Sequence, residues 1–293
     1  MTFVGDEIES QPAVWRSAVA LSDDDALPRA GQRVAFFGCG TSYYMALAAA
    51  ALRECAGVGE SDAFAASEMP LSRRYDTAVA LSRSGTTTEV LAVARQLDVP
   101  VVAVTADADA PLADVASRTV AMPFADERSV VQTRFATATL ALLRASFGLD
   151  VSGAIADCEV ALSPELPVAV DGVRQLVFLG RGWSVGLACE AALKVREAAQ
   201  AWSEAYPAME YRHGPISVAG PGTVVWALDR NLPAGLAEEI ESTGAVLVPA
   251  SGDPMAELVR VQRFAVALAE ARGLDPDRPR NLTRSVVLDA GGP

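Results

Sequence analysis

Apolar residues recur along this chain in two patterns that alternate over most of its length. Short, continuous apolar runs are typical of strands buried in a parallel sheet, and apolar residues at helical spacing are typical of amphipathic helices. The runs predict strands at residues 33–37, 62–65, 76–81, 99–105, 119–122, 175–179, 223–228 and 245–249. Helices are expected between them, among them 89–97, 133–147, 185–202 and 254–272. This alternation predicts an α/β protein built on doubly wound parallel sheets.

The plan of the first half of the chain repeats in the second half. A strand runs into a glycine turn and a helix at Phe37–Ser42, and the same order recurs at Leu179–Ser184. The repeat indicates an internal duplication of about 140 residues. Gly, Asp, Ser and Pro gather in the stretch 148–167, which is the expected boundary. We therefore expect two domains, 1–150 and 151–293.

The turn between the strand at 76–81 and the helix at 89–97 is unusually rich in hydroxyl groups. Within seven residues it holds five of them, on Ser82, Ser84, Thr86, Thr87 and Thr88. Free N–H groups and the positive dipole end of the helix suit a phosphate here, and Gly85 lets the backbone approach it. The alternative is ordinary capping, with Thr86 and Glu89 as a capping box. A cap needs one hydroxyl, so the density of hydroxyls favours anion binding.

A second polar turn follows the first predicted strand. Gly38 and Gly40 lead into Thr41 and Ser42 at the start of an alanine-rich helix. A dinucleotide fingerprint requires a glycine where Tyr43 stands, and a P-loop requires Gly-Lys-Ser/Thr, so neither nucleotide motif is satisfied. Because ligands of such sheets bind beyond the carboxyl ends of the strands, we expect the two turns to converge on one site. The second half has no comparable Ser-rich turn, so one phosphate site per chain is expected.

Charge and composition narrow the class of partner. The chain has 293 residues, with 24 basic against 37 acidic side chains and a net charge of −13. This balance argues against nucleic acid or an anionic membrane surface as the main partner. Four cysteines lack CxxC spacing, so neither a zinc site nor a disulfide framework is indicated, and the longest apolar stretch, Met45–Leu52, is too short to span a membrane. We expect a soluble, cytoplasmic protein.

Two stretches of the second half carry residues suited to proton transfer. Glu190, Lys194 and Glu197 recur at helical spacing and share one stripe, which on periodicity alone favours a solvated face with an exposed ion pair. A polar, aromatic segment, expected to be a loop, follows at Ser203–Pro215. It holds His213, the only histidine of the chain, and histidine is suited to proton transfer near neutral pH.

Four segments taken together resemble the sugar isomerase (SIS) family, in particular the isomerase half of glucosamine-6-phosphate synthase and the related deglycases and deaminases. They are Phe37–Tyr43, Ser82–Thr87, Glu190–Glu197 and Glu204–Pro215, in the order of the family. The resemblance implies two flavodoxin-like SIS subdomains and a sugar-phosphate substrate. It implies that the phosphate is held by Ser42, Ser82, Ser84 and Thr87, with help from the Thr41 backbone. Arg83 stands where the synthase has glutamine and would add a charge-assisted bond.

The resemblance also implies roles in catalysis. Glu197 would be the base that moves a proton between C1 and C2, with Lys194 beside it, which favours a functional role for the helix stripe over a solvated face. His213 would be the ring-opening acid and base, supplied by the neighbouring subunit, so a homodimer with shared sites is implied. Gln132 falls in a sugar-contacting block of the family.

Two departures from the family pattern limit what is expected. The chain begins Met1-Thr2 and lacks the cysteine of a glutaminase domain, so glutamine-dependent amination is not expected. Arg284 stands where the synthase has an imine-forming lysine, and arginine stays protonated and cannot attack a carbonyl. On sequence alone the tail around Arg284 is either part of the substrate site or a flexible end.

The expected function follows from these residues and the resemblance. It is proton transfer at C1/C2 of a 6-phosphosugar, as an isomerase or as a deaminase or deglycase of an amino-sugar phosphate. No cofactor, metal, nucleic acid or membrane is expected. The alternative is a catalytically silent module that senses a phosphosugar, which would need only the phosphate-binding turn.

Overall fold

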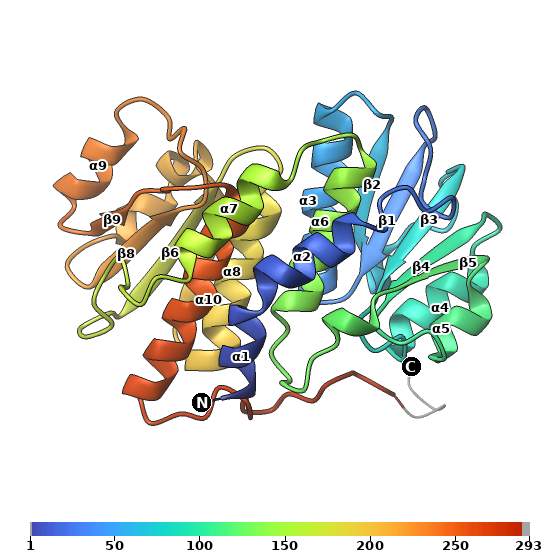
Figure 1. The fold of residues 1–293 in the computed structure, drawn as a ribbon. Helices are drawn as coiled ribbons and strands as arrows, with labels where there is room; N and C mark the ends of the chain where they lie inside the picture. The colour runs from blue at the N-terminus through green and yellow to red at the C-terminus, as the bar shows by residue number, and fades with distance from the viewer. Residues whose placement is uncertain (1, 289–293) are drawn as a thin grey trace. The chain divides into compact units, whose positions relative to one another are not determined.

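The computed structural model describes residues 2–288 (Figure 1). The chain divides into two compact units, which we name by their sheets. The five-stranded unit comprises Ala13–Val151 and residues 281–288, and the four-stranded unit comprises residues 2–12 and Ser152–Arg280. The sequence predicted a single boundary after residue 150. In the structure, in addition, the N-terminal segment belongs to the four-stranded unit and the C-terminal segment belongs to the five-stranded unit.

The five-stranded unit is a doubly wound parallel sheet in the order β2-β1-β3-β4-β5. Its strands are β1 (Val34–Gly38), β2 (Ser61–Ala65), β3 (Thr77–Leu81), β4 (Val101–Thr105) and β5 (Arg118–Ala121). Its helices are α2 (Gln11–Val19, most of which belongs to this unit), α3 (Thr41–Cys55), α4 (Thr88–Gln96), α5 (Pro111–Val115) and α6 (Arg134–Ser146), with short 3₁₀ turns η1 (Ala66–Glu68) and η2 (Pro123–Ala125). The central strands β1, β3 and β4 are buried throughout, as their continuous apolar runs predict.

The direction of winding in this sheet reverses between β1 and β3. The chain moves from β1 outward to β2, and from β3 the opposite way to β4. Because parallel crossovers are right-handed, the reversal places α3 and α4 on opposite faces, and Figure 1 shows α3 with α6 on one face and α4 with α5 on the other. The carboxyl ends of β1 and β3 therefore form a topological switch point, where ligands of such sheets bind.

The four-stranded unit repeats this plan in the parallel order β7-β6-β8-β9. Its strands are β6 (Gln175–Gly180), β7 (Ser203–Pro207), β8 (Thr223–Ala227) and β9 (Val246–Val248). Its helices are α1 (Phe3–Glu9), α7 (Ser152–Ala161), α8 (Ser184–Ala199), α9 (Leu236–Ser242) and α10 (Pro254–Ala271), with 3₁₀ turns η3 (Glu210–His213) and η4 (Pro215–Val218). The order matches β2-β1-β3-β4, as the internal duplication predicts, and β5 has no counterpart within residues 2–288.

One expectation about local structure was wrong. Ser203–Pro207 was expected to be a loop, but it is the edge strand β7, paired in register with β6. The sequence pattern did not reveal this strand, because its residues are mostly polar and it ends in proline. Both features are compatible with an edge strand, which is only half buried and tolerates proline. The N-terminal segment forms α1 and α2 with the break at Ser10, and Pro12 lies in the first turn of α2, where proline is favourable. Across residues 2–288, no helix is long and apolar enough to cross a membrane.

Candidate functional site

The hydroxyl-rich turn Ser82–Thr87 joins β3 to α4 at the switch point of the five-stranded sheet. The side chain of Thr87, at the N-cap of α4, makes no capping hydrogen bond. The N–H of Thr86, which a capping box would give to Glu89, instead donates to Ser84 Oγ at 3.2 Å. Ordinary capping therefore does not account for the hydroxyls of this turn.

Three of these hydroxyls converge on one point, and we call Ser84, Thr86 and Thr87 the hydroxyl cradle. At that point lies the hydroxyl of Ser285 from the C-terminal tail. Its Oγ is 2.8 Å from Thr86 Oγ1, 3.2 Å from Ser84 Oγ and 3.5 Å from Thr87 Oγ1. A group with several acceptor oxygens, such as a phosphate, would use the same donors.

Ser82 and Gly85 give the turn its shape. The buried Ser82 side chain accepts the Gly85 N–H at 3.2 Å. Gly85 has a φ of +62°, and a Cβ there would lie 2.5 Å from the Cβ of Ala110. Only glycine fits both the backbone conformation and the space, so the turn requires it.

Thr41 and Ser42 are buried at the N-terminal end of α3, after β1. Gly38 allows this end to approach β3 closely, since a Cβ at Gly38 would lie 2.7 Å from Ser42 Cβ and 2.9 Å from the Leu81 carbonyl oxygen. The structure therefore brings the two predicted turns to the same edge of the sheet.

The Arg83 guanidinium is turned toward protein acceptors and not toward the cradle. It is 1% exposed, and it donates to the carbonyl oxygens of Ser129 at 3.0 Å, Val130 at 3.4 Å and Arg284 at 3.1 Å. It also pairs with the buried Glu127 carboxylate at 3.4 Å. Burial lowers the pKa of Arg83, and the neighbouring Glu127 carboxylate opposes this shift only in part. The structure thus offers no support for the expected bond from Arg83 to phosphate, and it shows Arg83 holding the tail.

The tail is attached along its length and is not a free end within the described residues. The Arg284 guanidinium donates to the Glu127 carbonyl oxygen and pairs with the Asp126 carboxylate. Further on, the Val286 carbonyl accepts the Thr88 N–H at 3.2 Å, and the Leu288 N–H donates to Thr88 Oγ1 at 2.9 Å. The tail therefore covers the start of α4.

A pocket of about 570 Å³ adjoins the cradle within the five-stranded unit. Cradle residues, three aspartates and the tail line it, namely Ser84, Thr86, Ala106, Asp107, Ala108, Asp109, Pro123, Asp126, Arg284 and Ser285. Gln132 does not line this pocket, but its amide oxygen is buried and has no hydrogen-bond partner among the described residues. Such an oxygen is costly unless a donor reaches it, and a contact between Gln132 and a sugar stays a prediction.

The charged stripe of the four-stranded unit is buried in α8, so the solvated-face interpretation is wrong. The side chains of Glu190 and Lys194 are 0% and 1% exposed. Lys194 Nζ lies 3.3 Å from Glu190 Oε1 and donates to Glu197 Oε2 at 2.5 Å. Burial lowers the pKa of this ammonium, but the carboxylates of Glu190 and Glu197 outweigh burial and raise the pKa of Lys194. Of the three side chains, Glu197 is the most accessible, at 17% exposed.

His213 lies away from this cluster. Glu197 is on the last turn of α8, just before β7 begins, whereas His213 ends η3, beyond the other end of β7. The two residues therefore lie at opposite ends of the strands: Glu197 is near the amino end of β7 and His213 is beyond its carboxyl end. The His213 side chain is exposed. No hydrogen bond or ion pair joins them in the described part of the chain.

Tyr211 is a candidate that the sequence did not single out within the polar segment. It is 1% exposed, and its hydroxyl has no hydrogen-bond partner among residues 2–288. Burial, with the nearby Glu204 and Tyr206, raises the pKa of Tyr211 to about 12, so it stays a neutral donor. An aromatic residue in an otherwise aliphatic chain was the only available signal.

Comparison with known families gives a domain-family match within the five-stranded unit. A family model described as the SIS domain matches residues 27–148, which lie entirely within that unit. Residues 27–148 form an SIS domain. This SIS domain contains the cradle, Thr41, Ser42 and Gln132, whereas Glu197, His213 and Arg284 lie outside the match.

Similar proteins extend the likeness beyond residues 27–148. The glutamine–fructose-6-phosphate aminotransferase (isomerizing) of Sulfolobus acidocaldarius is 27% identical over 98% of this chain and 57% of its own length. The chain thus spans little more than half of that relative. The enzyme of the same name from Aeropyrum pernix is 35% identical over 40% of this chain and 24% of its own length.

Solved structures with the same fold align with nearly the whole chain. The crystal structure of glucosamine-6-phosphate deaminase from Thermotoga maritima has a TM-score of 0.82 and 26% identity, and the alignment covers 98% of both chains. Tagatose-6-phosphate ketose/aldose isomerase from Escherichia coli aligns with a TM-score of 0.78 over 98% of this chain and 96% of its own, at 18% identity, which shows a common fold.

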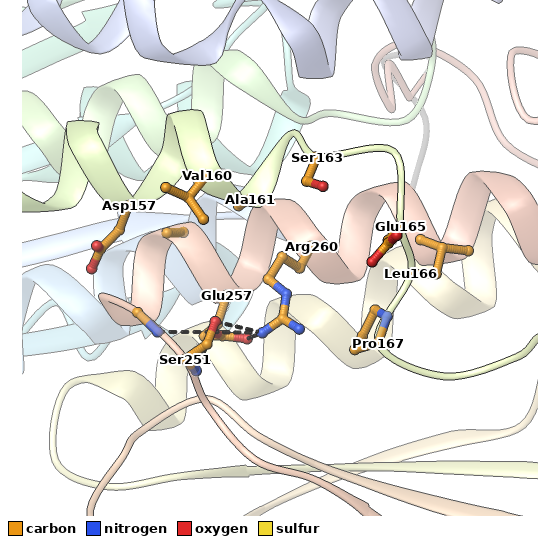
Figure 2. Close-up of a pocket in the computed structure, with 12 residues that line it drawn as sticks. Asp157, Val160, Ala161, Ser163, Glu165, Leu166, Pro167, Ser251, Glu257 and Arg260 are labelled. Atoms are coloured by element: carbon orange, nitrogen blue, oxygen red, sulfur yellow. Dashed lines mark hydrogen bonds and ion pairs between the residues drawn. The ribbon is translucent and has the colours of Figure 1, made fainter.

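Outside the SIS domain, the four-stranded unit has a pocket of about 260 Å³ beside α7 and the start of α10 (Figure 2). The Glu257 carboxylate occupies the polar end of this pocket. Its Oε1 accepts the N–H groups of Ser251 at 2.6 Å and Gly252 at 3.0 Å, and Arg260 Nη1 lies 2.9 Å from both carboxylate oxygens. This anion-binding loop is therefore occupied by the protein's own carboxylate, and none of the predicted site residues lines the pocket.

Proposed function

We propose that this chain is a phosphosugar enzyme that transfers a proton between C1 and C2 of a 6-phosphosugar, as an isomerase or as a deaminase or deglycase of an amino-sugar phosphate. The proposal includes a cytoplasmic homodimer. In this proposal the hydroxyl cradle and Ser42 bind the phosphate. Ser82 shapes the turn that carries the cradle. The names of the similar proteins, which include a deaminase, an aminotransferase and an isomerase of 6-phosphosugars, support this class of substrate.

The observation that carries the proposal is the buried cluster on α8. A lysine fixed between two carboxylates is costly to bury, and a module that only senses a phosphosugar has no use for it. Glu197 keeps partial access to solvent and is positioned to act as a base. In this proposal the Glu197 carboxylate takes the proton from the carbon beside the carbonyl and returns it to the neighbouring carbon. The Lys194 ammonium holds the carboxylate in place.

The position of His213 supports the shared site. Within one chain it lies at the opposite end of the strands from Glu197, so it does not serve the same substrate as Glu197 of its own chain. We propose that His213 enters the site of a second copy of the chain, where it opens the sugar ring by moving a proton. Its exposure leaves it accessible to a partner.

A turnover screen tests the proposed class. The purified chain is offered hexose 6-phosphates, amino-sugar 6-phosphates and glycated amino acid phosphates, and products are separated by mass and by released amine. Turnover of at least one compound that requires proton movement at C1/C2 supports the enzyme. Binding of these compounds without turnover by any of them would instead identify a sensing module, which the cradle alone could serve.

A further inference from the structure

His213 stands where two short turns meet, and its own side chain does not fix its direction. It is the last residue of η3, and η4 begins two residues later. Its imidazole is exposed and makes no hydrogen bond or ion pair within residues 2–288. A single 3₁₀ turn is not stable by itself in water, because too few hydrogen bonds offset the order that it requires. Neighbouring elements therefore determine where His213 points.

Tyr211 fixes the inner side of η3. Its side chain is 1% exposed and belongs to the same buried cluster as Leu236 and Ile240, both on α9. Its ring also lies beside that of Tyr206 on β7, with the ring centroids 6.0 Å apart. The turn is therefore packed against both α9 and the edge strand, directly ahead of His213.

Arg212, the residue directly before His213, joins the outer side of η3 to the same helix. Its Nε donates to Glu239 Oε2 at 2.7 Å, and its Nη2 donates to Glu239 Oε1 at 2.9 Å. Nη2 also donates to the carbonyl oxygen of Ala234, just ahead of α9, at 2.6 Å. The hydrogen bonds between the two side chains lower the pKa of Glu239 and raise the pKa of Arg212, so both groups are charged at neutral pH. We call this pair the Arg212–Glu239 clamp.

The clamp matters for orientation and not for stability. Its side chains are 23% and 47% exposed, and ion pairs this exposed add little to the free energy of unfolding. A planar guanidinium that meets both oxygens of one carboxylate, however, fixes the direction as well as the distance between them. Lysine would keep the charge but not this geometry. Glu239 precedes Ile240, which is fully buried, so the carboxylate stands on a helix that is fixed to the core.

We propose that Arg212 and Glu239 are positioning residues for His213: the clamp ties its backbone to α9 and so sets the direction from which its imidazole enters the site of a second copy. In this proposal neither residue touches the substrate, and both act through His213. The inference rests on the proposed function in one respect, since it takes His213 as the ring-opening group of a shared site. It adds that α9 is the element that aims this group, which requires precise placement to move a proton.

The first test measures the mobility of His213 itself. Because it is the only histidine of the chain, a protein labelled in histidine alone gives a single backbone amide signal in nuclear magnetic resonance. Glu239→Gln removes the charge of the clamp 27 residues away from Arg212 along the chain, so it leaves the sequence of η3 unchanged. Glu241→Gln, at an exposed glutamate of the same helix, is the matched control. The order parameter of the His213 amide should fall in Glu239→Gln from the value of rigid backbone, about 0.85, toward that of flexible segments, below about 0.6, and should not change in Glu241→Gln.

The second test measures the catalytic consequence with a 6-phosphosugar that the parent turns over. Glu239→Gln should lower kcat by roughly tenfold to a hundredfold and leave KM nearly unchanged, because a displaced acid or base impairs chemistry more than binding. Arg212→Lys should show a similar loss, since lysine cannot bridge both oxygens, whereas Glu241→Gln should behave as the parent. In a His213→Asn background, Glu239→Gln should cause no further loss, because the group that it positions is already gone.

An unchanged order parameter or an unchanged kcat in Glu239→Gln would overturn the clamp, and His213 would keep its proposed role if His213→Asn alone loses activity. A loss from Glu239→Gln that adds in full to the loss from His213→Asn would also overturn the clamp, because the pair would then act on something other than His213. Full activity of His213→Asn would refute the ring-opening role in the proposed function, and the positioning role with it.

Discussion

Lys194 donates a 2.5 Å hydrogen bond to Glu197 and lies 3.3 Å from Glu190, and both partners are carboxylates. These two negative charges outweigh burial and raise the pKa of Lys194. The amine is therefore protonated at neutral pH and has no lone pair to attack a carbonyl. The same contacts orient Glu197, so the lysine supports a base and does not act as a nucleophile.

Borohydride should trap no covalent adduct between the protein and a phosphosugar. Arg284 cannot form an imine, and Lys194 is held as an ammonium. The measurement is the intact mass of the protein after incubation with substrate and borohydride, with Lys194→Ala as the matched control. An adduct that maps to Lys194 and is lost in the control would show imine catalysis and contradict this prediction.

The stabilising effect of Lys194 should disappear in strong base. Its folded pKa is raised above the ordinary value of 10.5, so its contribution is fully present below that value and is lost as pH rises through the folded pKa. The free energy of unfolding of the parent, relative to Lys194→Met, should therefore fall as the pH rises above 10.5. Urea unfolding of both proteins at each pH gives this difference. A difference that is constant or grows over this range would contradict the assigned direction of the pKa.

Ser84→Ala should weaken the binding of every phosphosugar and of inorganic phosphate to a similar extent. The lost bond is to a charged group, so the expected cost is about 1.5 to 3 kcal/mol. Calorimetry against several 6-phosphosugars measures it, and Ser72→Ala, an exposed serine of the same unit, is the control. Losses that differ strongly between sugars would place Ser84 at the sugar and not at the phosphate.

Two inactive variants should restore activity to each other if the site is shared between subunits. Glu197→Gln lacks the base and His213→Asn lacks the ring-opening group, but a mixed dimer has one site with both residues intact. Activity is measured after the two proteins are mixed under conditions that exchange subunits, with formation of the mixed dimer checked by native mass spectrometry. Verified mixed dimers without recovered activity would refute the shared site.

The sequence predicted most of the fold because continuous apolar runs and glycine turns are local signals. The duplication, the strand-to-helix turn at Ser82–Thr87 and its Gly85 were all readable in this way. β7 was missed because an edge strand is only half buried and its residues are mostly polar. β7 lacks an apolar pattern because it lies at the edge of the sheet, so a segment without such a pattern can still be a strand.

The parts of the site that sequence reasoning did not find depend on contacts between distant segments. Arg83 was expected at a phosphate, but its partners are Glu127 and the backbone of Arg284, which is 201 residues away along the chain. Ser285 was not singled out, because nothing local marks a serine in a tail as the neighbour of Ser84. Helical spacing is the same for a buried and an exposed stripe of charged residues. It therefore did not reveal that Glu190 and Lys194 face the interior.

The central claim is that Glu197 moves a proton at the carbon beside the sugar carbonyl. The most direct measurement is exchange of that hydrogen with deuterated solvent, followed by nuclear magnetic resonance on a 6-phosphosugar found to bind. The parent and Glu241→Gln, an exposed glutamate of the same unit, should catalyse exchange. Glu197→Gln should abolish it while binding phosphate nearly as well, because a base acts in the transition state more than in ground-state binding. Exchange that persists in Glu197→Gln would contradict the account.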